Sequence, residues 1–562
     1  MPRSASRAPG YAPRTSTAVA AAKDSSSVGR SQADKVCNGV SDDVYLLALL
    51  SKMTAGGKLT LQEGRYVITA PILYPFDDIV IEGQGPGTII DGDGLATGEH
   101  AFVISGKTDC GLKNLAVQTE DGGGKVCHCV FIEDGADRYD IDGITIIESD
   151  SDGIHVEGTD ITGGKIHDID VLGADGYGVY VNMDALNHMN HIGLKDNTIS
   201  GCVKGTMIYD VDWGVITGNV CTGNSNEGMF FGLSEELLID GNDCSSNTQR
   251  GINMDGVTYS VITNNIAYNN VLDNILLQSC DYNLVEGNMA EQNSNAFADG
   301  IQVDAGSTNN VIKGNHSILS ARHGIRVLGA KNIVEGNHVY NSGDHGILVE
   351  AADIDVRGNY CYHNGVDAVG TYDGIHLIGA ADRCIVNGNR CWDDGSAQED
   401  GIHLEDGAVN CQVEGNYCYN NMGDGIELVA NNDYCQINDN YCWLNDDYGI
   451  AITAATCNEN MVHDNYLYGN VTGQLLDNGT DTDIDGNTGF VDHAYGEDTI
   501  TAGNVTIVVA HGLAGTPSSI RITPQEAEGV DHFVDTVGAA NFTMNITAIQ
   551  IVDVAFYWRA EV

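Results

Sequence analysis

Two Asp-Gly-Ile-His segments bring together side chains that could transfer protons. Asp373 and His376 belong to the first segment, and Asp400 and His403 belong to the second. If one segment stacks on the other, Asp373 lies over Asp400 and His376 lies over His403, each about 5 Å apart. Two neighbouring carboxyl groups push one pKa upward, and a nearby histidine can act as an acid or a base. We therefore predict that these four residues carry any catalysis, with one carboxyl group as the acid and the other as the base or nucleophile.

A longer stripe of polar side chains continues on both sides of these four residues. Its members stand beside the same Gly-Ile step: His323, Arg326, His345, Asp424 and Glu427. The intervals are also longer here, and the extra residues, 363–374 and 392–401, would form walls that include Trp392. An elongated groove lined by Asp, His and Trp suits a polysaccharide, so we predict that these six residues bind glycan. The alternative is a solvated acidic face, because Asp before Gly is favourable turn chemistry.

Four aspartates near the end of the chain's repeats have the spacing of a calcium-binding loop. They are Asp481, Asp483, Asp485 and Asp492, with Asp in place of the usual final Glu. Calcium is therefore a candidate cofactor. The alternative is an ordinary turn, because Ile484-Asp485-Gly486-Asn487 aligns with Val413-Glu414-Gly415-Asn416 of an earlier repeat.

Cys127-His128-Cys129 is a weaker metal pattern. No second pair of Cys or His completes four zinc ligands, and in a strand His128 would point away from both cysteines. We therefore expect these three residues to be structural.

A repeat defines the elements that would position these side chains. Gly-Asn pairs recur at intervals in the twenties from Gly218-Asn219 to Gly486-Asn487, and Gly-Ile pairs recur in step with them. Between the pairs, apolar and polar residues alternate with the period of a β-strand. Short strands joined by Gly or Asn turns at one repeat length predict an all-β solenoid, a parallel β-helix. An Asn at the same turn of every coil can bond to the Asn of the next coil.

The sixteen cysteines follow the same repeat. Two columns are visible: Cys221, Cys244, Cys361, Cys391, Cys418 and Cys442 in the first, and Cys384, Cys411 and Cys435 in the second. Stacked small apolar side chains fill a narrow core well, and a free cysteine behaves as one. We therefore predict core thiols. Disulfides stay open as the alternative, because stacked Cα atoms about 4.8 Å apart fall within the allowed range.

The segment 39–70, NGVSDDVYLLALLSKMTAGGKLTLQEGRYVIT, differs from the repeats. Ser41 can cap a helix over 41–54, with an apolar stripe of Val44, Leu47, Leu50 and Met53. Such a helix would cover the open end of the solenoid, where strand edges are otherwise unpaired.

This segment, together with IEGQGPGTIIDGDG at 81–94, resembles the start of the pectate-lyase-like superfamily. The resemblance covers residues 36–490 and implies a right-handed parallel β-helix there. The superfamily includes pectate lyases, polygalacturonases, alginate epimerases and phage tailspikes, so the resemblance is specific for the fold and not for one function. The enzyme motifs of polygalacturonases and alginate epimerases are missing; Tyr372-Asp373-Gly374-Ile375-His376 only echoes the latter.

Charge is distributed unevenly along the chain. Lys+Arg 26 against Asp+Glu 79 gives a formal net charge of −53, which repels nucleic acid and suits a saline, halophilic setting. Residues 1–35 carry six basic and two acidic residues (6 − 2 = +4), and we predict a flexible basic arm that anchors the protein to an acidic partner. No segment reaches the ~18 apolar residues of a membrane span. No apolar run marks a Sec signal near the start.

The segment 491–562 predicts a small C-terminal β-sandwich, because short alternating strands are separated by turns. It resembles modules attached to β-helices in tail proteins of phages and archaeal viruses, through His511-Gly512-Leu513, Thr516-Pro517 and the terminal Trp558-Arg559-Ala560-Glu561-Val562. The resemblance implies a virion surface protein, a tailspike or fibre, that contacts host polysaccharide or glycoprotein with or without degrading it. By the same analogy we expect a homotrimer whose N-terminal arm binds other virion proteins.

Two other classes stay open. A cellular polysaccharide lyase, hydrolase or epimerase fits the solenoid and its groove, and a cell-surface adhesin fits the solenoid without catalysis. Either of these would place the protein outside the cell rather than on a virion.

Overall fold

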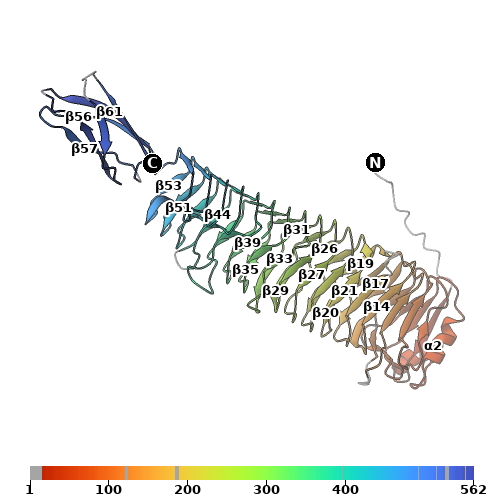
Figure 1. Cartoon of the computed structure of the whole chain (residues 1–562). Coiled ribbons are helices and arrows are strands. Elements are labelled where there is room, and N and C mark those ends of the chain that lie inside the picture. Colours follow the sequence, from red (N-terminus) through yellow and green to blue (C-terminus); the bar gives the residue numbers. More distant parts are fainter. Residues whose placement is uncertain are drawn as a thin grey trace. The chain divides into compact units, whose positions relative to one another are not determined.

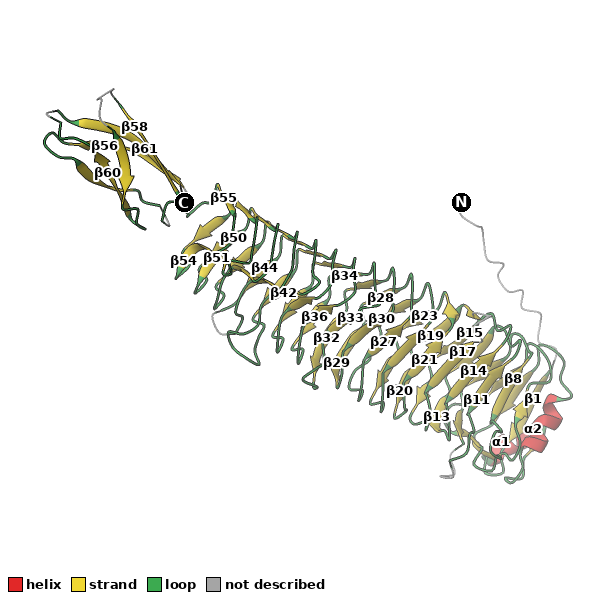
Figure 2. Ribbon diagram, in the orientation of Figure 1, coloured by secondary structure: helices red, strands yellow, loops and turns green. Residues whose placement is uncertain are grey.

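A computed structural model describes residues 16–119, 124–183, 189–394, 397–490, 493–513, 516–525, 531–550 and 552–561. The chain divides into unit 1, Met1–Gly343, and unit 2, Asp344–Val562. In both units short strands are stacked coil upon coil (Figure 1), and unit 2 also contains a C-terminal module of antiparallel strands. The helices among the described residues are α1 and α2 (Figure 2). The predicted right-handed parallel β-helix is confirmed. No helix among the described residues combines the length and the apolar character needed to cross a membrane.

The coils of unit 1 pair through parallel strands on three sheets. The sheet that matters for function contains β5 (Ile72–Leu73), β8 (Phe102–Ser105), β11 (Val130–Glu133), β14 (Ile154–Gly158), β17 (Val179–Met183), β21 (Thr206–Tyr209), β25 (Met229–Gly232), β27 (Ile252–Asp255), β30 (Ile275–Gln278), β33 (Ile301–Val303) and β36 (Ile325–Val327). We call it the third sheet, because it closes each coil.

Unit 2 repeats this plan. Its third sheet contains β39 (Ile347–Val349), β42 (Ile375–Ile378), β45 (Ile402–Glu405), β48 (Ile426–Val429), β51 (Tyr448–Ile452) and β54 (Gly473–Asp477). Its first sheet contains β40 (Asp355–Arg357), β43 (Ile385–Asn387), β46 (Gln412–Glu414), β49 (Gln436–Asn438), β52 (Met461–His463) and β55 (Asp483–Asp485). Its second sheet contains β41 (Tyr360–Tyr362), β44 (Arg390–Trp392), β47 (Tyr417–Tyr419), β50 (Tyr441–Trp443) and β53 (Tyr466–Tyr468).

The predicted asparagine ladder is present in both units. In unit 1 it runs from Asn197 to Asn337, and in unit 2 from Asn359 to Asn487, with side-chain amides bonded at 2.8 to 3.0 Å. Where the residue before the ladder Asn is not Gly, it is Asp196, Asn264, Asp439 or Asp464, each with φ of 54° to 55°. Asn and Asp tolerate this left-handed conformation better than other residues with a side chain, which explains the substitutions.

The cysteine columns lie inside the coils, as predicted. All sixteen cysteines are buried as free thiols. Cys361, Cys391 and Cys418 stand opposite one another on β41, β44 and β47. Thiols of the second column donate to backbone carbonyls, for example Cys435 to Ala408 at 3.1 Å.

The N-terminal helix is shorter than predicted. Helix α2 spans Asp43–Leu50, and Asp42 rather than Ser41 precedes it. The carboxylate of Asp42 accepts the backbone N–H of Gly39 and of Val67 instead of capping the helix. Leu46 and Leu50 are buried and Val44 is 60% exposed, so the apolar stripe is rotated from the predicted one.

The expectation that all of 1–35 is a flexible arm is wrong for its described part. Strand β1 (Thr17–Ala21) pairs in parallel with β3 (Lys58–Leu61), and α1 (Ser27–Gln32) follows, capped by the Ser26 hydroxyl. The small side chains of Ala20 and Ala21 are fully buried, which lets this strand join the first coil. Residues 1–15 lie outside the described residues, and with them half of the basic residues of the predicted arm.

The C-terminal module has two antiparallel sheets of three strands. The strands are β56 (His493–Ile500), β61 (Val554–Glu561) and β58 (Ser519–Pro524) in one sheet, and β57 (Thr506–Ala510), β60 (Asn541–Ile546) and β59 (His532–Asp535) in the other. Phe542, Phe556 and Trp558 belong to one buried cluster shared by both sheets. The alternation that predicted a sandwich is the alternation of these buried side chains.

Candidate functional site

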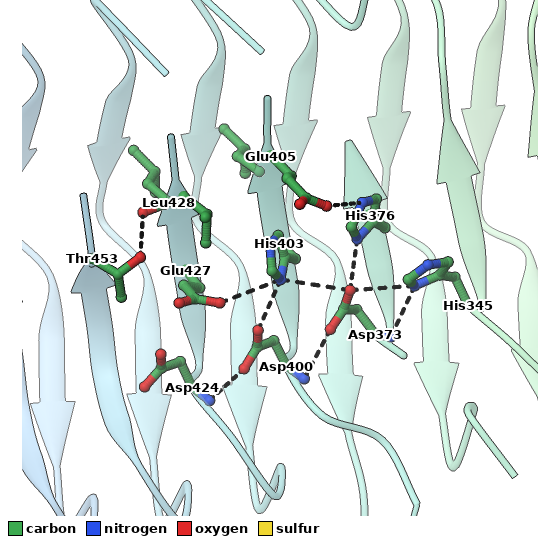
Figure 3. Close-up of polar contacts among 12 residues, drawn as sticks. His345, Asp373, His376, Asp400, His403, Glu405, Asp424, Glu427, Leu428 and Thr453 are labelled. Carbon is green, nitrogen blue, oxygen red and sulfur yellow. Dashed lines mark hydrogen bonds and ion pairs between the residues drawn. The ribbon is translucent and has the colours of Figure 1, made fainter. Parts of the chain in front are cut away.

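The strand register of unit 2 places the predicted residues side by side on its third sheet. His376 on β42 stands opposite His403 on β45, which stands opposite Glu427 on β48 (Figure 3). The neighbouring Ile375 and Leu377 point into the core and are fully buried. The glycine before each Ile is needed for close approach, since a Cβ on Gly374 would come within 2.7 Å of the carbonyl oxygen of Gly401.

One carboxylate oxygen of Asp373, Asp400 and Asp424 accepts a backbone N–H from the turn of the following coil. The backbone N–H of Asp400 donates to Oδ1 of Asp373 at 3.1 Å, and the N–H of Asp424 donates to Oδ1 of Asp400 at 2.5 Å. The N–H of Tyr448 continues the series to Oδ1 of Asp424 at 2.6 Å. The turn chemistry of the alternative reading is therefore present, but it occupies only one oxygen of each carboxyl group.

The second carboxylate oxygen, Oδ2, of Asp373 and of Asp400 faces histidine side chains. Oδ2 of Asp373 lies 2.7 Å from Nδ1 of His376 and 3.2 Å from Nδ1 of His345. Nδ1 of His403 lies 3.0 Å from Oδ2 of Asp400 and 3.7 Å from Oδ2 of Asp373. The predicted stacking is confirmed, because the ring centroids of His376 and His403 are 4.8 Å apart. We call Asp373, His376, Asp400, His403, Asp424 and Glu427 the Asp–His row.

The carboxyl groups of the row differ in pKa. Burial favours the neutral form of Asp373, but His403 and the hydrogen bonds of His345 and His376 outweigh it and lower its pKa. Burial, reinforced by the charge of Asp373, raises the pKa of Asp400 well above its usual value. Burial also raises the pKa of Asp424, to about 7. Adjacent coils therefore hold two carboxyl groups whose pKa values are shifted in opposite directions.

The two stacked histidines differ as well. Burial lowers the pKa of His376 despite its hydrogen bond to Asp373. Burial would also lower the pKa of His403, but Asp373, Asp400 and Glu427 around its Nδ1 raise it to about 10. Nε2 of His403 is buried and has no hydrogen-bond partner. His403 is thus a charged donor with one N–H to give.

The row is open to solvent only along its outer edge. Asp373 and Asp400 are 1% and 2% exposed, whereas the side chain of Glu405 is 41% exposed. Oε2 of Glu405 lies 3.5 Å from Nε2 of His376, and Oε2 of Glu427 lies 3.4 Å from Nδ1 of His403. A ligand from solvent would reach these two glutamates first.

The structure divides the predicted glycan-binding residues. His345, Asp424 and Glu427 lie in the row or beside it, while His323 and Arg326 belong to unit 1. Trp392 lies on the second sheet of unit 2, its ring stacked between Tyr362 and Tyr419 at 4.6 and 5.7 Å. The aromatic residue that meets the row is instead Tyr372 in the first inserted segment, 5.0 Å from the ring of His345.

The predicted calcium residues do not form a loop in the described part of the segment. Asp483 and Asp485 lie on strand β55, which pairs with β52, and both are exposed. Asp481 is the left-handed residue of the preceding turn, with φ of 54°. Asp492 lies outside the described residues. The spacing thus coincides with the turn and strand of the last coil, and calcium binding at these residues stays a prediction.

A second histidine cluster, in unit 1, was missed. Nδ1 of His155 lies 2.6 Å from Oδ2 of Asp152, and Nδ1 of His128 lies 3.5 Å from the same oxygen. His128 was taken for a strand residue, but β11 begins only at Val130, and His128 is buried beneath His100. The signal was available, because Asp152-Gly153-Ile154-His155 has the same order of residues as the two segments of unit 2.

Burial sets the charge of this second cluster. It lowers the pKa of His128 to about 3, and the nearby His155 adds to the effect. It likewise lowers the pKa of His100 to about 4. These imidazoles are neutral at physiological pH, in contrast to His403.

Comparison with known families finds one match over most of the chain. The family model described as "Periplasmic copper-binding protein (NosD)" matches residues 137–318 and 308–495. No curated protein matches the sequence.

Solved structures share the coiled architecture at low identity. A periplasmic alginate epimerase, AlgG, is 18% identical over 60% of this chain and 86% of its own, with a TM-score of 0.42. The protein DFA-IIIase from Arthrobacter chlorophenolicus A6 is 12% identical over 66% of this chain and 93% of its own, with a TM-score of 0.35. The tailspike gp61 of Pseudomonas phage phi297 is 10% identical over 93% and 92%, with a TM-score of 0.28. These scores are too low to support an argument about function.

Proposed function

The chain belongs to the NosD family of proteins described as periplasmic and copper-binding, and from this premise we propose that it works outside the cytoplasm and acts on polysaccharide at the Asp–His row. The family description supplies the compartment. The row supplies the chemistry, and copper is treated separately below.

The observation that carries the proposal is the pairing of opposite pKa shifts on adjacent coils. The pKa of Asp373 is lowered and that of Asp400 is raised, while their neighbour His403 has an Nε2 without a hydrogen-bond partner. Two carboxyl groups whose pKa values are pushed apart are the acid and the base of many hydrolases. In glycoside cleavage, one protonates the leaving oxygen and the other activates water or attacks the sugar.

A polymer suits the row better than a small molecule does. The polar groups recur once per coil along the stacking direction, about 4.8 Å apart, and their outer edge carries Glu405 and Glu427. A chain of sugars can contact several coils at once. Because the protein has a net charge of −53, it repels polyuronates, so we infer a neutral polysaccharide.

The test is cleavage of neutral and uronate polysaccharides by purified protein, followed by the release of reducing ends. We expect cleavage of a neutral glycan and a loss of about 100-fold or more in Asp400→Asn. Glu414→Gln, an exposed change on the first sheet of unit 2, is the matched control and should retain the rate. Undiminished cleavage by Asp400→Asn would remove the row from the mechanism, and binding without cleavage by the wild type would favour an adhesin.

The setting is a finer proposal. A virion appendage, homotrimeric and suited to salt, is supported by the acidic surface and the basic residues of 1–35. The family description as periplasmic favours a cellular polysaccharide enzyme instead. Deleting residues 1–15 and mass measurement in molar salt separate these settings. A monomer that no particle incorporates would exclude the virion appendage.

A further inference from the structure

We propose that His128, Asp152 and His155 of unit 1 form a binding site for a divalent transition-metal ion, with Cu(II) as the preferred occupant. The site lies in unit 1, and the proposal is independent of polysaccharide chemistry at the row. The family description names copper but assigns no residues.

The donor atoms are already gathered. The three residues can offer Nδ1 of His128, Oδ2 of Asp152 and Nδ1 of His155, and the ligand atoms of the group all lie within 4.8 Å of one another. Metal–ligand bonds of about 2.0 to 2.2 Å place two donors of one ion about 3 to 3.5 Å apart. The separation of 3.5 Å between His128 and Asp152 fits, and the 2.6 Å between Asp152 and His155 needs only a small opening.

Two hydrogen-bond acceptors of the cluster, one on His128 and one on Asp152, lie close to each other. Nδ1 of His128 accepts the backbone N–H of Asp152 at 3.1 Å, so this nitrogen carries a lone pair rather than a proton. The carboxylate oxygen of the same Asp152 lies 3.5 Å from it. A cation near both would turn this unfavourable approach into ligation, and would replace the hydrogen bond.

A supporting carboxylate is also in place. Oε2 of Glu157 lies 3.1 Å from Nε2 of His155, on the side of the ring opposite Asp152. Metal-bound imidazoles commonly have their second nitrogen oriented by such a carboxylate. Without a metal, Nδ1 of His155 donates to Oδ2 of Asp152 at 2.6 Å, so metal binding at Nδ1 would move the ring proton to Nε2, beside Glu157.

The cluster has a pocket beside its supporting carboxylate, Glu157. A pocket of about 290 Å³ is lined by Glu133, Asp134 and Glu157, among others. Carboxylates at a pocket attract cations. Phe131 and Tyr180 pack against the His155 ring from their own coils, at 5.3 and 4.6 Å, and shield the cluster elsewhere.

The donor set selects the kind of ion. Two imidazoles and one carboxylate suit Cu(II), Ni(II) and Zn(II), and affinity for a given site is highest for Cu(II) in this series. Soft Cu(I) prefers thiolates, but the thiols of Cys127 and Cys129 donate to the carbonyls of Ala96 and Glu148 instead. Calcium prefers a shell of oxygens, which this cluster does not provide.

The experiment is titration of the full-length chain with Cu(II) and, separately, Zn(II), followed by calorimetry and by the electron paramagnetic resonance of bound Cu(II). We expect one equivalent of Cu(II) with nitrogen couplings from two imidazoles, and tighter binding than Zn(II). Asp152→Asn and His155→Ala should each lose that equivalent or weaken it at least 10-fold. Copper should also raise the melting temperature of the wild type.

Asp373→Asn is the matched control, because His345, Asp373 and His376 repeat the geometry in unit 2, where the charged His403 lies 3.7 Å from Asp373 and disfavours a cation. It should leave the unit 1 equivalent intact. The proposal is overturned if wild type binds no Cu(II), if bound Cu(II) shows no nitrogen couplings, or if Asp152→Asn binds as the wild type does. Circular dichroism of each variant identifies unfolding, and Asp152→Asn, which is isosteric, decides the matter if His155→Ala unfolds.

Discussion

The histidine cluster of unit 1 and the Asp–His row of unit 2 start from the same four residue types and end with opposite charge. In both, an aspartate before Gly-Ile-His holds the histidine of its own coil and that of the coil before. The following coil then differs. Tyr180 stands opposite His155 in unit 1, whereas His403 stands opposite His376 in unit 2 and brings Asp400 with it.

The neighbouring coil, and not the Asp-Gly-Ile-His motif itself, therefore sets the protonation state of a histidine. Buried against His100, His155 and Phe131, His128 has its pKa lowered to about 3 and stays neutral, as a metal ligand must. Surrounded by three carboxyl groups, His403 has its pKa raised to about 10 and stays charged, as a proton donor must. A solenoid can therefore use one turn sequence for two kinds of chemistry.

The largest effect is expected for His403→Tyr. This change places a tyrosine opposite His376 in unit 2, as Tyr180 stands opposite His155 in unit 1. The change removes the charged donor and the counter-charge that keeps Asp373 ionised. We expect glycan cleavage to fall by about 100- to 10,000-fold. Reducing-end release measures it, with Glu414→Gln as the control. Cleavage within a few-fold of wild type would mean that the neighbouring coil does not set the chemistry.

The asparagine ladder is present in both units, so its mutation should destabilise both units equally. Asn265 and Asn416 each donate to the next ladder Asn and to a backbone carbonyl, and each accepts from the previous Asn. Replacing either by Ala leaves buried polar groups unpaired, and we expect each change to lower the free energy of unfolding by about 3 kcal/mol. The midpoint of urea unfolding measures this, with exposed Gln412→Ala as the control. Unequal losses would show that the ladder differs between units.

The pH dependence of stability should separate the row from the unit 1 cluster. The folded pKa of His403 is raised above its usual value of 6.5 to about 10, so its stabilisation is complete below pH 6.5 and is lost as the pH rises through 10. Each pKa unit is worth about 1.4 kcal/mol, so raising the pH from 7 to 8.5 should cost the wild type about 2 kcal/mol from this group.

The same change of pH should cost His403→Tyr less, so the melting temperatures of variant and wild type should converge as the pH rises. Asp424 acts in the same direction at lower pH, because its pKa is raised from 3.8 to about 7 and its contribution is lost as the pH rises through 7. Asp373, with a lowered pKa, contributes above pH 3.8 and loses its contribution as the pH falls. Melting curves that stay parallel from pH 7 to 8.5 would contradict the charge assigned to His403.

The smallest expected effect concerns the edge of the row. Glu427→Gln should raise KM about 5-fold, because a hydrogen bond from sugar to a charged acceptor is about 1 kcal/mol stronger than one to the neutral amide oxygen of Gln. Trp392→Phe should leave KM unchanged, since its ring faces Tyr362 and Tyr419 on the second sheet. A larger KM effect of Trp392 than of Glu427 would restore the tryptophan to the glycan surface.

The sequence predicted the architecture because the repeat is enforced at every coil. Gly-Asn turns, a buried Asn and alternating side chains recur with little variation, so an error at one coil is corrected by its neighbours. The cap was harder. Asp42 uses its carboxylate for Gly39 and Val67, two backbone groups that only the folded coil brings near, and so the helix starts later than Ser41 would predict.

The candidate site was predicted in part. Stacking of His376 on His403 follows from the repeat length alone. Trp392 was expected in a wall beside the stripe, but it is the last residue of β44 on the second sheet, because that strand extends to the residue where the wall was expected to begin. His128 was missed for a related reason: its three consecutive buried residues, Cys127 to Cys129, lie outside a strand and do not alternate. The charge states arise from burial, which no local pattern contains.

The buried thiol columns have a consequence for biosynthesis. Cys391 has a cysteine above and below it in register, at the stacking distance of about 4.8 Å, within reach of a disulfide. In the folded coil all sixteen thiols are sealed from oxidants. In the nascent chain they are open, and cysteines from any two coils can join. The order of events therefore matters: a chain that coils before it meets an oxidant keeps its thiols, and a chain that meets the oxidant first is fixed in the wrong register.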